Sequence, residues 1–351
     1  MGPASSGTPR EIPQNPRPYP AGGSVLYRLT CPPNRTLALP LALVLDAVFG
    51  EPPPWGHPVV WVGALISTLE RGAPTGSAPR LAFGAAMTAV TVGGAALAGA
   101  VAGRLLRGLP GPVALLAEAW LLKTMLSARA LLEAGEQVEV CLDRADLDGA
   151  RQAAKSLVSR DVDSLDTRLL TSAAIESLAE NASDSIVAPL YYYAAGGLPA
   201  VFAYRAANTL DAMIGYRDQY EHLGKVAARL DDLLNLVPAR FTSTLLLAAG
   251  AVGGGDLGTG LSITGRDHGR TASPNAGWPM STMAGLLGTR LKKPGHYELG
   301  VGLPPPDLPA IDHAVELVKT ATVLAVPAMF GVAALARRVR ACLASRVRST
   351  R

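Results

Sequence analysis

The 351-residue sequence has few charged residues, which make up 17% of it, and few aromatic residues, which make up 5%. Soluble domains usually carry about a quarter charged residues. The apolar content is mostly Ala, Leu and Val, accompanied by 37 Gly, and the mean hydropathy is +0.24. Small residues in this proportion allow close packing of helices in lipid. The composition therefore predicts an all-α integral membrane protein with several membrane segments.

Several signatures of known sites are absent. The three cysteines, Cys31, Cys141 and Cys342, lie far apart without a CxxC or Cys/His spacing, which argues against a disulfide framework and against a zinc site. The sequence contains no GxxxxGK[ST] loop, no GxGxxG after a strand and no GxSxG elbow. A nucleotide, if the protein uses one, is therefore held by another kind of site.

The net charge of +4 comes largely from the C-terminal run ARRVRACLASRVRSTR. No aromatic residues interleave with these arginines and no nucleic-acid fold signature accompanies them, so we expect no nucleic-acid partner. A basic run directly after an apolar segment is typical of a cytoplasmic membrane flank. This places the C-terminus in the cytoplasm and the protein, as a multi-pass protein, in the cell (inner or plasma) membrane.

Composition divides the chain into three parts. Residues 1–36 are rich in Pro, Gly and Arg and are predicted to be a disordered extension without a signal peptide. Residues 37–336 form a single membrane-embedded domain, to which we assign the function. Residues 337–351 form the basic C-terminal tail.

Residues 81–103 contain no charge and are long enough to span a bilayer. Residues 317–336 are a further candidate span, and residues 37–50 are apolar but suit only a half-span or re-entrant element. If all motif loops share the cytoplasmic side with the C-terminus, the chain must cross an even number of times after Leu132. Residues 241–253 with their neighbours are the candidate for the additional crossing.

Two other apolar segments are interrupted. Residues 113–132 carry Glu118 and Lys123, which we expect to pair loosely or to face the bundle interior, because charge at the bilayer centre costs about 2.5–3.5 kcal/mol. Residues 186–204 contain GGLP at Gly196–Pro199, which predicts two half-helices. Such a re-entrant segment would bring residues 176–184 next to residues 208–216, with the freed backbone buried in protein.

The segments between the apolar runs are polar. Residues 133–172 are predicted to form amphipathic helices at the membrane face, outside the lipid. Residues 266–306 are rich in Gly and Pro and are predicted to be a long loop, which usually indicates a functional or disordered segment.

Glu176, Glu180 and Asp184 follow one another at intervals of four, with Asn181 beside them. On a helix, positions four apart differ by only about 40°, so the three carboxylates form one acidic stripe. Like charges at this spacing repel one another. The stripe is therefore either a solvated helix face or part of a cation-binding site.

Other polar clusters border the apolar runs. Asn208 and Asp211, and likewise Asp231 and Asn235, are spaced so that each pair shares a helix face. The remaining candidates are His57 in a Pro-rich turn, Arg160 and Asp161 in SRDVDSLD, Tyr216, Asp232, the arginines Arg205, Arg229 and Arg240, and Ser273 and Asn275 in the turn SPNAGWP. Capping or ion pairing would explain any one of them. Together, carboxylates and arginines without Cys or His ligands suit Mg²⁺ and a phosphorylated substrate.

Six stretches in this order resemble the CobD/CbiB family of membrane-associated cobalamin-biosynthesis enzymes. They are LDAVFGEPPPWGHPVVWVG, SRDVDSLD, AAIESLAENASDSIVAPL, NTLDAMIGY, ARLDDLLNLVPAR and SPNAGWP. The resemblance covers residues 41–336. The sequence departs from the family at Glu51, where Asp is more common, and at Met280, where an acidic residue is common, so we assign Met280 no metal role.

The resemblance implies an adenosylcobinamide-phosphate synthase. Such a ligase joins adenosylcobyric acid to (R)-1-amino-2-propanol phosphate, or to ethanolamine phosphate, through an amide bond, with ATP as cosubstrate and Mg²⁺ as cofactor. The implied partners are the corrinoid, the amino-alcohol phosphate, the lipid bilayer and other late membrane enzymes of the cobalamin pathway.

Within this reaction we assign roles from the residue types. The catalytic candidates are Glu176, Glu180, Asn181, Asp184, Asn208, Asp211 and Asp231. The metal ligands are Glu180, Asp184, Asp231 and Asp232. The substrate- and phosphate-binding candidates are His57, Arg160, Asp161, Tyr216, Arg229, Asn235, Arg240, Ser273 and Asn275.

Two alternatives stay open. Intramembrane charges and a broken helix are also features of transporters, so a non-enzymatic corrinoid transporter, or an AmpE-like signalling protein, would fit the same pattern. A transporter should show a paired repeat of the broken segment, and none is visible. A phosphotransferase acting on lipid alcohols lacks its Asp-rich DG signature here.

Overall fold

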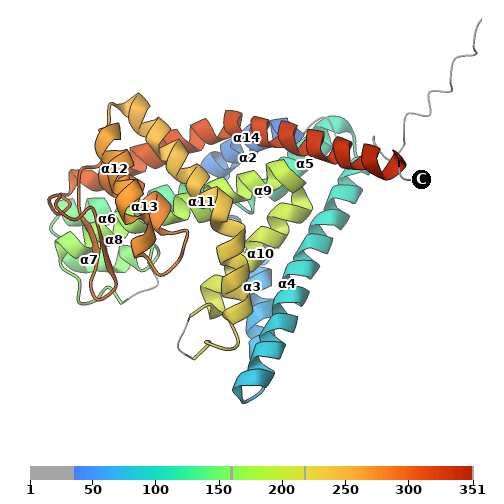
Figure 1. The fold of residues 1–351 in the computed structure, drawn as a ribbon, viewed down its shortest axis with the longest axis horizontal. Coiled ribbons are helices and arrows are strands. Elements are labelled where there is room, and N and C mark those ends of the chain that lie inside the picture. Colours follow the sequence, from blue (N-terminus) through green and yellow to red (C-terminus); the bar gives the residue numbers. More distant parts are fainter. Residues whose placement is uncertain (1–34, 159–160, 217–218, 350–351) are drawn as a thin grey trace, which may run out of the picture. The chain divides into compact units, whose positions relative to one another are not determined.

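The computed structural model describes residues 35–158, 161–216 and 219–349 (Figure 1). The predicted N-terminal extension, apart from residues 35 and 36, lies outside the described residues. The chain is 77% helical with two short strands, which confirms the all-α prediction. The residues predicted as a basic tail continue the last helix to Ser349.

The helices follow one another with short connections. They are α2 (Arg35–Phe49), α3 (Pro58–Glu70), α4 (Ser77–Leu105), α5 (Gly111–Lys123), α6 (Ala128–Asp143), α7 (Leu147–Ala154), α8 (Thr167–Ala182), the π-helical turn η3 (Ser183–Val187), α9 (Ala188–Gly196), α10 (Leu198–Ile214), α11 (Lys225–Gly253), α12 (Leu257–Asp267), α13 (Gly277–Leu286) and α14 (Pro309–Ser349). Strands β1 (Leu291–Lys293) and β2 (Tyr297–Leu299) form an antiparallel hairpin.

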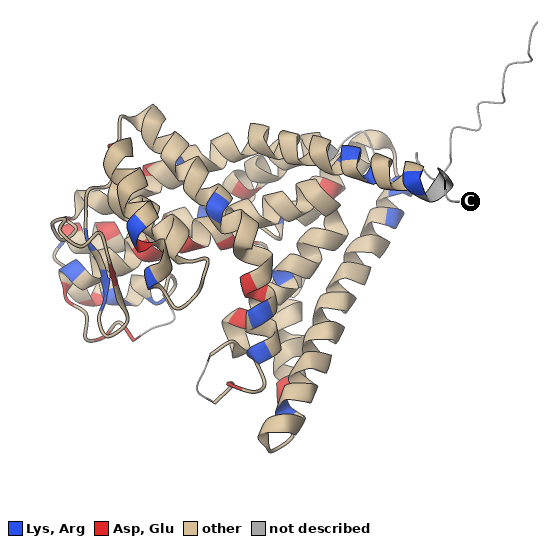
Figure 2. Cartoon of the chain, in the orientation of Figure 1, with Lys and Arg blue, Asp and Glu red and all other residues tan. Residues whose placement is uncertain are grey.

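Three of the described helices are long and apolar enough to cross a membrane. They cover Ser77–Gly108, Lys225–Gly253 and Pro309–Arg346. These ranges contain the three segments predicted at residues 81–103, 241–253 and 317–336. Residues 37–49 lie in the shorter apolar helix α2. Figure 2 shows that α4 carries charged residues only towards its two ends.

The apolar segment of residues 113–132 is not one continuous helix. Helix α5 ends at Lys123, and the chain turns before α6 begins at Ala128. In this turn the Ser127 amide donates a hydrogen bond to the Ser185 carbonyl oxygen of η3 (3.2 Å), which fixes the change of direction. Glu118 and Lys123 both face the interior, and the Lys123 ammonium lies 4.9 Å from the centre of the Trp120 ring.

The break predicted at GGLP is present. Helix α9 ends at Gly196, and Gly197 adopts a φ of +73°, which other residues rarely adopt, before Pro199 enters the first turn of α10. Helix α10 then packs along α4. A Cβ atom at Gly99 would lie 2.6 Å from the Leu198 carbonyl oxygen, so the two helices touch through backbone at this point.

Residues 266–306 are not the structureless loop that the Gly and Pro content suggested. Residues 277–286 form the helix α13, in which every residue except Trp278 is buried, and residues 291–299 form the hairpin. The apolar stretch from Gly277 to Leu286 is the signal that the composition of the wider segment concealed. Burial of this stretch against α8, α11 and α12 favours a helix despite its glycines.

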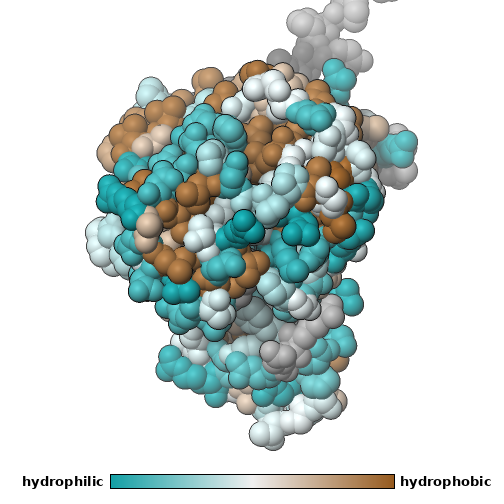
Figure 3. Space-filling view, turned by 90° about the vertical axis from the view of Figure 1, so that its left-hand side faces the viewer, coloured by the Kyte–Doolittle hydropathy of each residue, from teal (hydrophilic) through white to brown (hydrophobic). Residues whose placement is uncertain are grey.

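The end of the molecule that carries α6, α7 and the hairpin presents mainly hydrophilic residues, interrupted by separate hydrophobic strips (Figure 3). The exposed large apolar side chains are instead numerous on α2, on α4 and on α14 from Val323 to Leu343. This distribution places the polar helices of residues 133–172 on a surface suited to water.

Candidate active site

The acidic stripe that begins on α8 lines a cavity of about 570 Å³. Two residues of the stripe, Glu180 and Asp184, also line a smaller cavity of about 220 Å³. Among the predicted residues, the larger cavity is lined by Glu176, Glu180, Asn181, Asp184, Asn208, Asp211 and Tyr216. The smaller cavity is lined by Glu180, Asp184, Asp211, Asp231, Asp232, Asn235, Ser273 and Asn275. Glu180, Asp184, Asp211 and Gly215 border both cavities, and we call them the shared wall.

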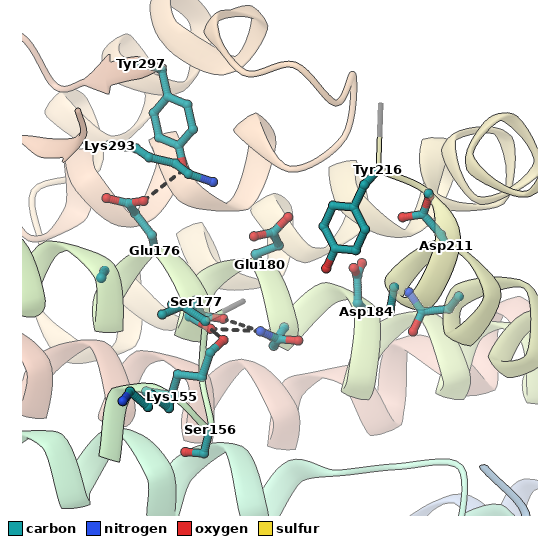
Figure 4. Close-up of a pocket in the computed structure, with 17 residues that line it drawn as sticks. Lys155, Ser156, Glu176, Ser177, Glu180, Asp184, Asp211, Tyr216, Lys293 and Tyr297 are labelled. Atoms are coloured by element: carbon teal, nitrogen blue, oxygen red, sulfur yellow. Dashed lines mark hydrogen bonds between the residues drawn. The ribbon is translucent and has the colours of Figure 1, made fainter. Parts of the chain in front are cut away.

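Helix α8 positions the stripe. Asp166 precedes the helix, and its carboxylate accepts a hydrogen bond from the Leu169 amide (2.9 Å) and so caps the first turn. At its other end the helix widens into the π turn η3, and Asp184 lies in this turn. Such turns are rare and occur frequently at functional sites. Figure 4 shows Glu176, Glu180 and Asp184 in a row along one side of the cavity.

Helices α10 and α11 bring amides to Asp231. Asn235 Nδ2 donates to one Asp231 oxygen (3.0 Å) and Asn208 Nδ2 to the other (3.4 Å). The Tyr204 hydroxyl lies 3.0 Å from Asn235 Oδ1 and 3.1 Å from the Asp184 carbonyl oxygen. The break at Gly197 therefore places residues of NTLDAMIGY beside the acidic stripe, as the re-entrant prediction required.

The shared wall concentrates negative charge. Burial, together with the neighbouring Asp231 and Glu180, raises the pKa of the Asp184 carboxyl well above its usual range. Burial, followed by the charges of Asp231 and Asp232, raises the pKa of Asp211 to about 7. Perturbed pKa values of this kind cluster at functional sites.

The turn SPNAGWP closes the smaller cavity. Asn275 Nδ2 donates to the Asp232 carbonyl oxygen (2.7 Å), and the Ser273 hydroxyl lies 3.4 Å from an Asp232 carboxylate oxygen. Arg240 reaches Asn275 Oδ1 (3.4 Å) and lies over the Trp278 ring at 4.7 Å. Arg240 thus supports the turn from behind, and it does not line either cavity.

Besides Arg240, three predicted binding residues of the described ranges do not line either cavity. Arg160 lies outside the described residues. The Asp161 carboxylate accepts a hydrogen bond from the Asp163 amide in an exposed turn. The Arg229 side chain is 76% exposed, and its guanidinium lies 3.8 Å from an Asp232 carboxylate oxygen. His57 pairs with Glu51 (2.8 Å) and caps α3, and neither residue lines the two cavities.

Arg205 of α10 links the His57 region to the site. Its guanidinium donates to Asn208 Oδ1 (3.2 Å) and to the Ser127 hydroxyl (3.4 Å). Burial opposes ionisation of Glu51, but hydrogen bonds from His57 and Ser127 outweigh it and lower the pKa of this carboxyl. The motif around Glu51 thus supports, through Ser127, an arginine that contacts Asn208.

The sequence reasoning missed the part of the larger cavity that the hairpin and the loop after α7 supply. Lys155, Ser156, Lys293 and Tyr297 line it. The Tyr297 hydroxyl donates to Glu176 Oε2 (2.9 Å), and the Ser172 hydroxyl donates to Glu176 Oε1 (2.7 Å). The alternation in LKKPGHYEL around a Pro-Gly turn was the available signal for this hairpin.

The shared wall suits a hard cation. Carboxylates crowd together there, and carboxylate oxygen is the ligand that Mg²⁺ prefers. Within the described ranges, however, no group of three or more His, Cys, Asp or Glu side chains is arranged to hold a metal ion by itself. Mg²⁺ commonly binds through one or two carboxylates together with substrate phosphates. The donor set fits a metal that arrives with a phosphorylated substrate.

The site lies in a region that related proteins share. Residues 39–344 match the family model described as CobD/Cbib protein. The cobalamin biosynthesis protein CobD of Dehalococcoides mccartyi is 41% identical over 266 residues, which cover 76% of this chain and 86% of that protein. Those of Rhizobium meliloti (40% over 272 residues, 74% and 83% of the two chains) and Photorhabdus laumondii (39% over 260 residues, 73% and 82%) are similar.

No solved structure matches the chain. The family match covers both cavities, all the described motifs and nearly all of the helical domain. The chain belongs to the CobD/CbiB family.

Proposed function

We propose that this protein is an ATP-dependent ligase that joins adenosylcobyric acid to aminopropanol phosphate or ethanolamine phosphate and forms adenosylcobinamide phosphate. The relatives are named cobalamin biosynthesis proteins, which supports the pathway. The observation that carries the reaction is the shared wall. Its carboxylates border two polar cavities, which suits a reaction that uses two phosphorylated substrates, ATP and the amino-alcohol phosphate.

The proposed chemistry has two steps. A carboxylate oxygen of the corrinoid attacks the γ-phosphorus of ATP, the bond to the β-phosphate oxygen breaks, and ADP leaves. The amine of the amino-alcohol phosphate then attacks the acyl carbon, a C–N bond forms, the C–O bond to phosphate breaks, and inorganic phosphate leaves. The ammonium form of this amine must first lose a proton, so the site needs a base.

Asp211 is suited to be this base. A general base works best when its pKa lies near the operating pH, and the pKa of Asp211 is raised to about 7. Its carboxylate borders both cavities and can therefore reach an amine held in either. Asn208 and Asn235 hold Asp231 in one orientation beside it.

One or two of the candidate ligands Glu180, Asp184, Asp231 and Asp232, together with a substrate phosphate, would hold Mg²⁺, which when bound supplies positive charge to the transferring phosphoryl group. Ser273 and Asn275 offer a hydroxyl and an amide at the rim of the smaller cavity. The corrinoid is too large for either cavity and would bring only its reacting carboxylate to the wall. We propose that the enzyme works in the cell membrane beside other late enzymes of the pathway.

A transporter is the less favoured candidate. The family relationship gives it no support, and a transporter has no need for a base beside two polar cavities. A transporter or signalling protein would bind corrinoid without requiring ATP and amine together.

The test uses purified, detergent-solubilised protein with adenosylcobyric acid, aminopropanol phosphate, ATP and Mg²⁺. We expect mass spectrometry to detect the amide product only when all four components are present. Ethanolamine phosphate in place of aminopropanol phosphate identifies the preferred amine. A folded protein that binds corrinoid but forms no amide would contradict the proposed function.

A further inference from the structure

We propose that the larger cavity is the binding site for the triphosphate of the nucleotide and that Lys293 is a phosphate-binding residue in it. This inference rests on the proposed function, because it assigns one of that reaction's substrates to one of the two cavities. Neither the family motifs nor the acidic stripe includes Lys293, which lies in the hairpin between α13 and α14.

The ammonium group of Lys293 is not held in an ion pair within the described residues. It also makes no hydrogen bond with any group in the described part of the chain, whereas the neighbouring Lys292 pairs with Glu298 across the hairpin (2.5 Å). Lys293 lines the larger cavity, and Figure 4 shows its side chain beside Tyr297, on the side of the cavity that faces Glu176 and Glu180. A cation on one wall and carboxylates on the other suit a metal-bound polyphosphate between them.

The hairpin holds Lys293 firmly in this position. The Lys292 amide donates to the Ser172 hydroxyl (2.7 Å), and the Tyr297 hydroxyl donates to Glu176 (2.9 Å). Lys293 lies directly opposite Tyr297 in the strand pairing. Because successive residues of a strand point to opposite faces, Lys293 faces the cavity while Lys292 does not. Both anchors are on α8, the helix that carries the acidic stripe.

The two cavities differ in size in a way that assigns their ligands. Pockets for drug-sized ligands commonly measure about 300–1,000 Å³. The larger cavity, at about 570 Å³, falls in this range, and the smaller one, at about 220 Å³, does not. The smaller cavity therefore suits the amino-alcohol phosphate. The shared wall then lies between the γ-phosphoryl group and the amine.

The experiment compares Lys293→Met with Lys292→Met, which removes an adjacent lysine outside the cavity. The probe is AMP-PNP with Mg²⁺, and its Kd is measured on detergent-solubilised full-length protein. We expect Lys293→Met to raise this Kd and the KM for ATP at least about tenfold, a loss of about 1.4 kcal/mol. The KM for aminopropanol phosphate should stay within about twofold, and Lys292→Met should leave all three constants near those of the unaltered protein.

Lys293→Arg separates a phosphate contact from a structural role. The arginine keeps the positive charge and can bind phosphate, so it should restore most of the lost nucleotide affinity. Equal losses in the Met and Arg variants, or equal Kd values in Lys293→Met and Lys292→Met, would overturn the assignment. A raised KM for aminopropanol phosphate with unchanged nucleotide binding would also overturn it, because the ligands would then be exchanged between the cavities.

Failure of the two proposals can be told apart. The binding of AMP-PNP is measured without corrinoid or amine, so it tests the cavity whether or not amide forms. Lack of amide product in the unaltered protein contradicts the ligase. Lack of AMP-PNP binding in a protein that does form amide contradicts only the placement of the nucleotide.

Discussion

Asp184 is buried close to other carboxylates, so the ionised form that the proposed reaction needs destabilises the folded protein. Its raised pKa means that the folded protein favours the protonated carboxyl. The stability from this group is complete below the pKa of the unfolded chain, about 3.8, and is lost as pH rises through the folded pKa. At neutral pH without Mg²⁺, Asp184→Asn should therefore leave the thermal unfolding temperature unchanged or raise it. Amide synthesis should fall at least about 100-fold.

The measurement pairs turnover with thermal unfolding in detergent. Ser172→Ala provides a control on the same helix, since it removes a hydroxyl that contacts Glu176 and the Lys292 amide without altering charge. This control should lower the unfolding temperature through lost hydrogen bonds. If Asp184→Asn lowered the unfolding temperature as the control does, its loss of activity would reflect structure rather than chemistry.

The raised pKa of Asp211 predicts how the rate of amide formation depends on pH. If it accepts the proton of the amine, kcat/KM for aminopropanol phosphate should rise with pH and level off above about 7, where the carboxyl is ionised. A cation bound nearby would favour the ionised form and move the midpoint to lower pH, never to higher pH. Asp211→Asn should lower the plateau value of kcat/KM and abolish its rise with pH. A pH–rate profile that keeps the same rise in Asp211→Asn would assign the proton transfer to another group.

At the scale of elements, the contact between α4 and α10 fixes where the broken helix returns. A Cβ at Gly99 would lie 2.6 Å from the Leu198 carbonyl oxygen, whereas a Cβ at Gly103 would meet nothing within 4 Å. Gly99→Ala must push α10 away from α4, and overpacking of this kind costs about 1–3 kcal/mol. We expect a lower unfolding temperature and reduced activity, because α10 carries Asn208 and Asp211. Gly103→Ala, one turn away, should change neither, and equal behaviour of both variants would contradict this contact.

The elements also show how far the sequence could predict the site. Helical spacing placed Glu176, Glu180 and Asp184 together, because their contact is local and needs only the period of a helix. The Gly-Gly-Leu-Pro break was equally readable, because glycine and proline act on the backbone of their own segment. Lys293 was not predictable, because its place in the cavity depends on a hairpin anchored to α8 more than 100 residues earlier in the chain. No local pattern encodes such a contact.

At the scale of the whole molecule, α4 has the site at one end and the C-terminal arginines at the other. Near its start, Gly84 packs on the Leu223 backbone, next to the end of α10 and Gly215 of the shared wall. Near its end, Gly99 packs on Leu198, which follows the α9 terminus, and there Arg340 of α14 donates to the Ala195 carbonyl oxygen. The two contacts on α4 are about 22 Å apart along the helix axis.

This separation sets two expectations from the sequence against each other. The arginines favour a cytoplasmic C-terminus, and a site that uses ATP must open to the cytoplasm. If α4 crosses the membrane, the protein cannot satisfy both. The arginines contribute only a statistical bias among possible orientations, whereas access to cytoplasmic ATP is an absolute requirement of the proposed reaction. We therefore expect the end of α4 that begins at Ser77 to face the cytoplasm.

Cysteine labelling in intact cells tests this orientation. The native Cys342 is exposed on α14 beyond Arg340, and Ser77→Cys places a thiol at the other end of α4, with Cys31 and Cys141 replaced by serine. A membrane-impermeant maleimide should label Cys342 in intact cells and should label the cysteine at position 77 only after the membrane is permeabilised. Labelling of both thiols from one side would show that α4 does not cross. The reverse pattern would place the shared wall away from ATP and would contradict the ligase itself.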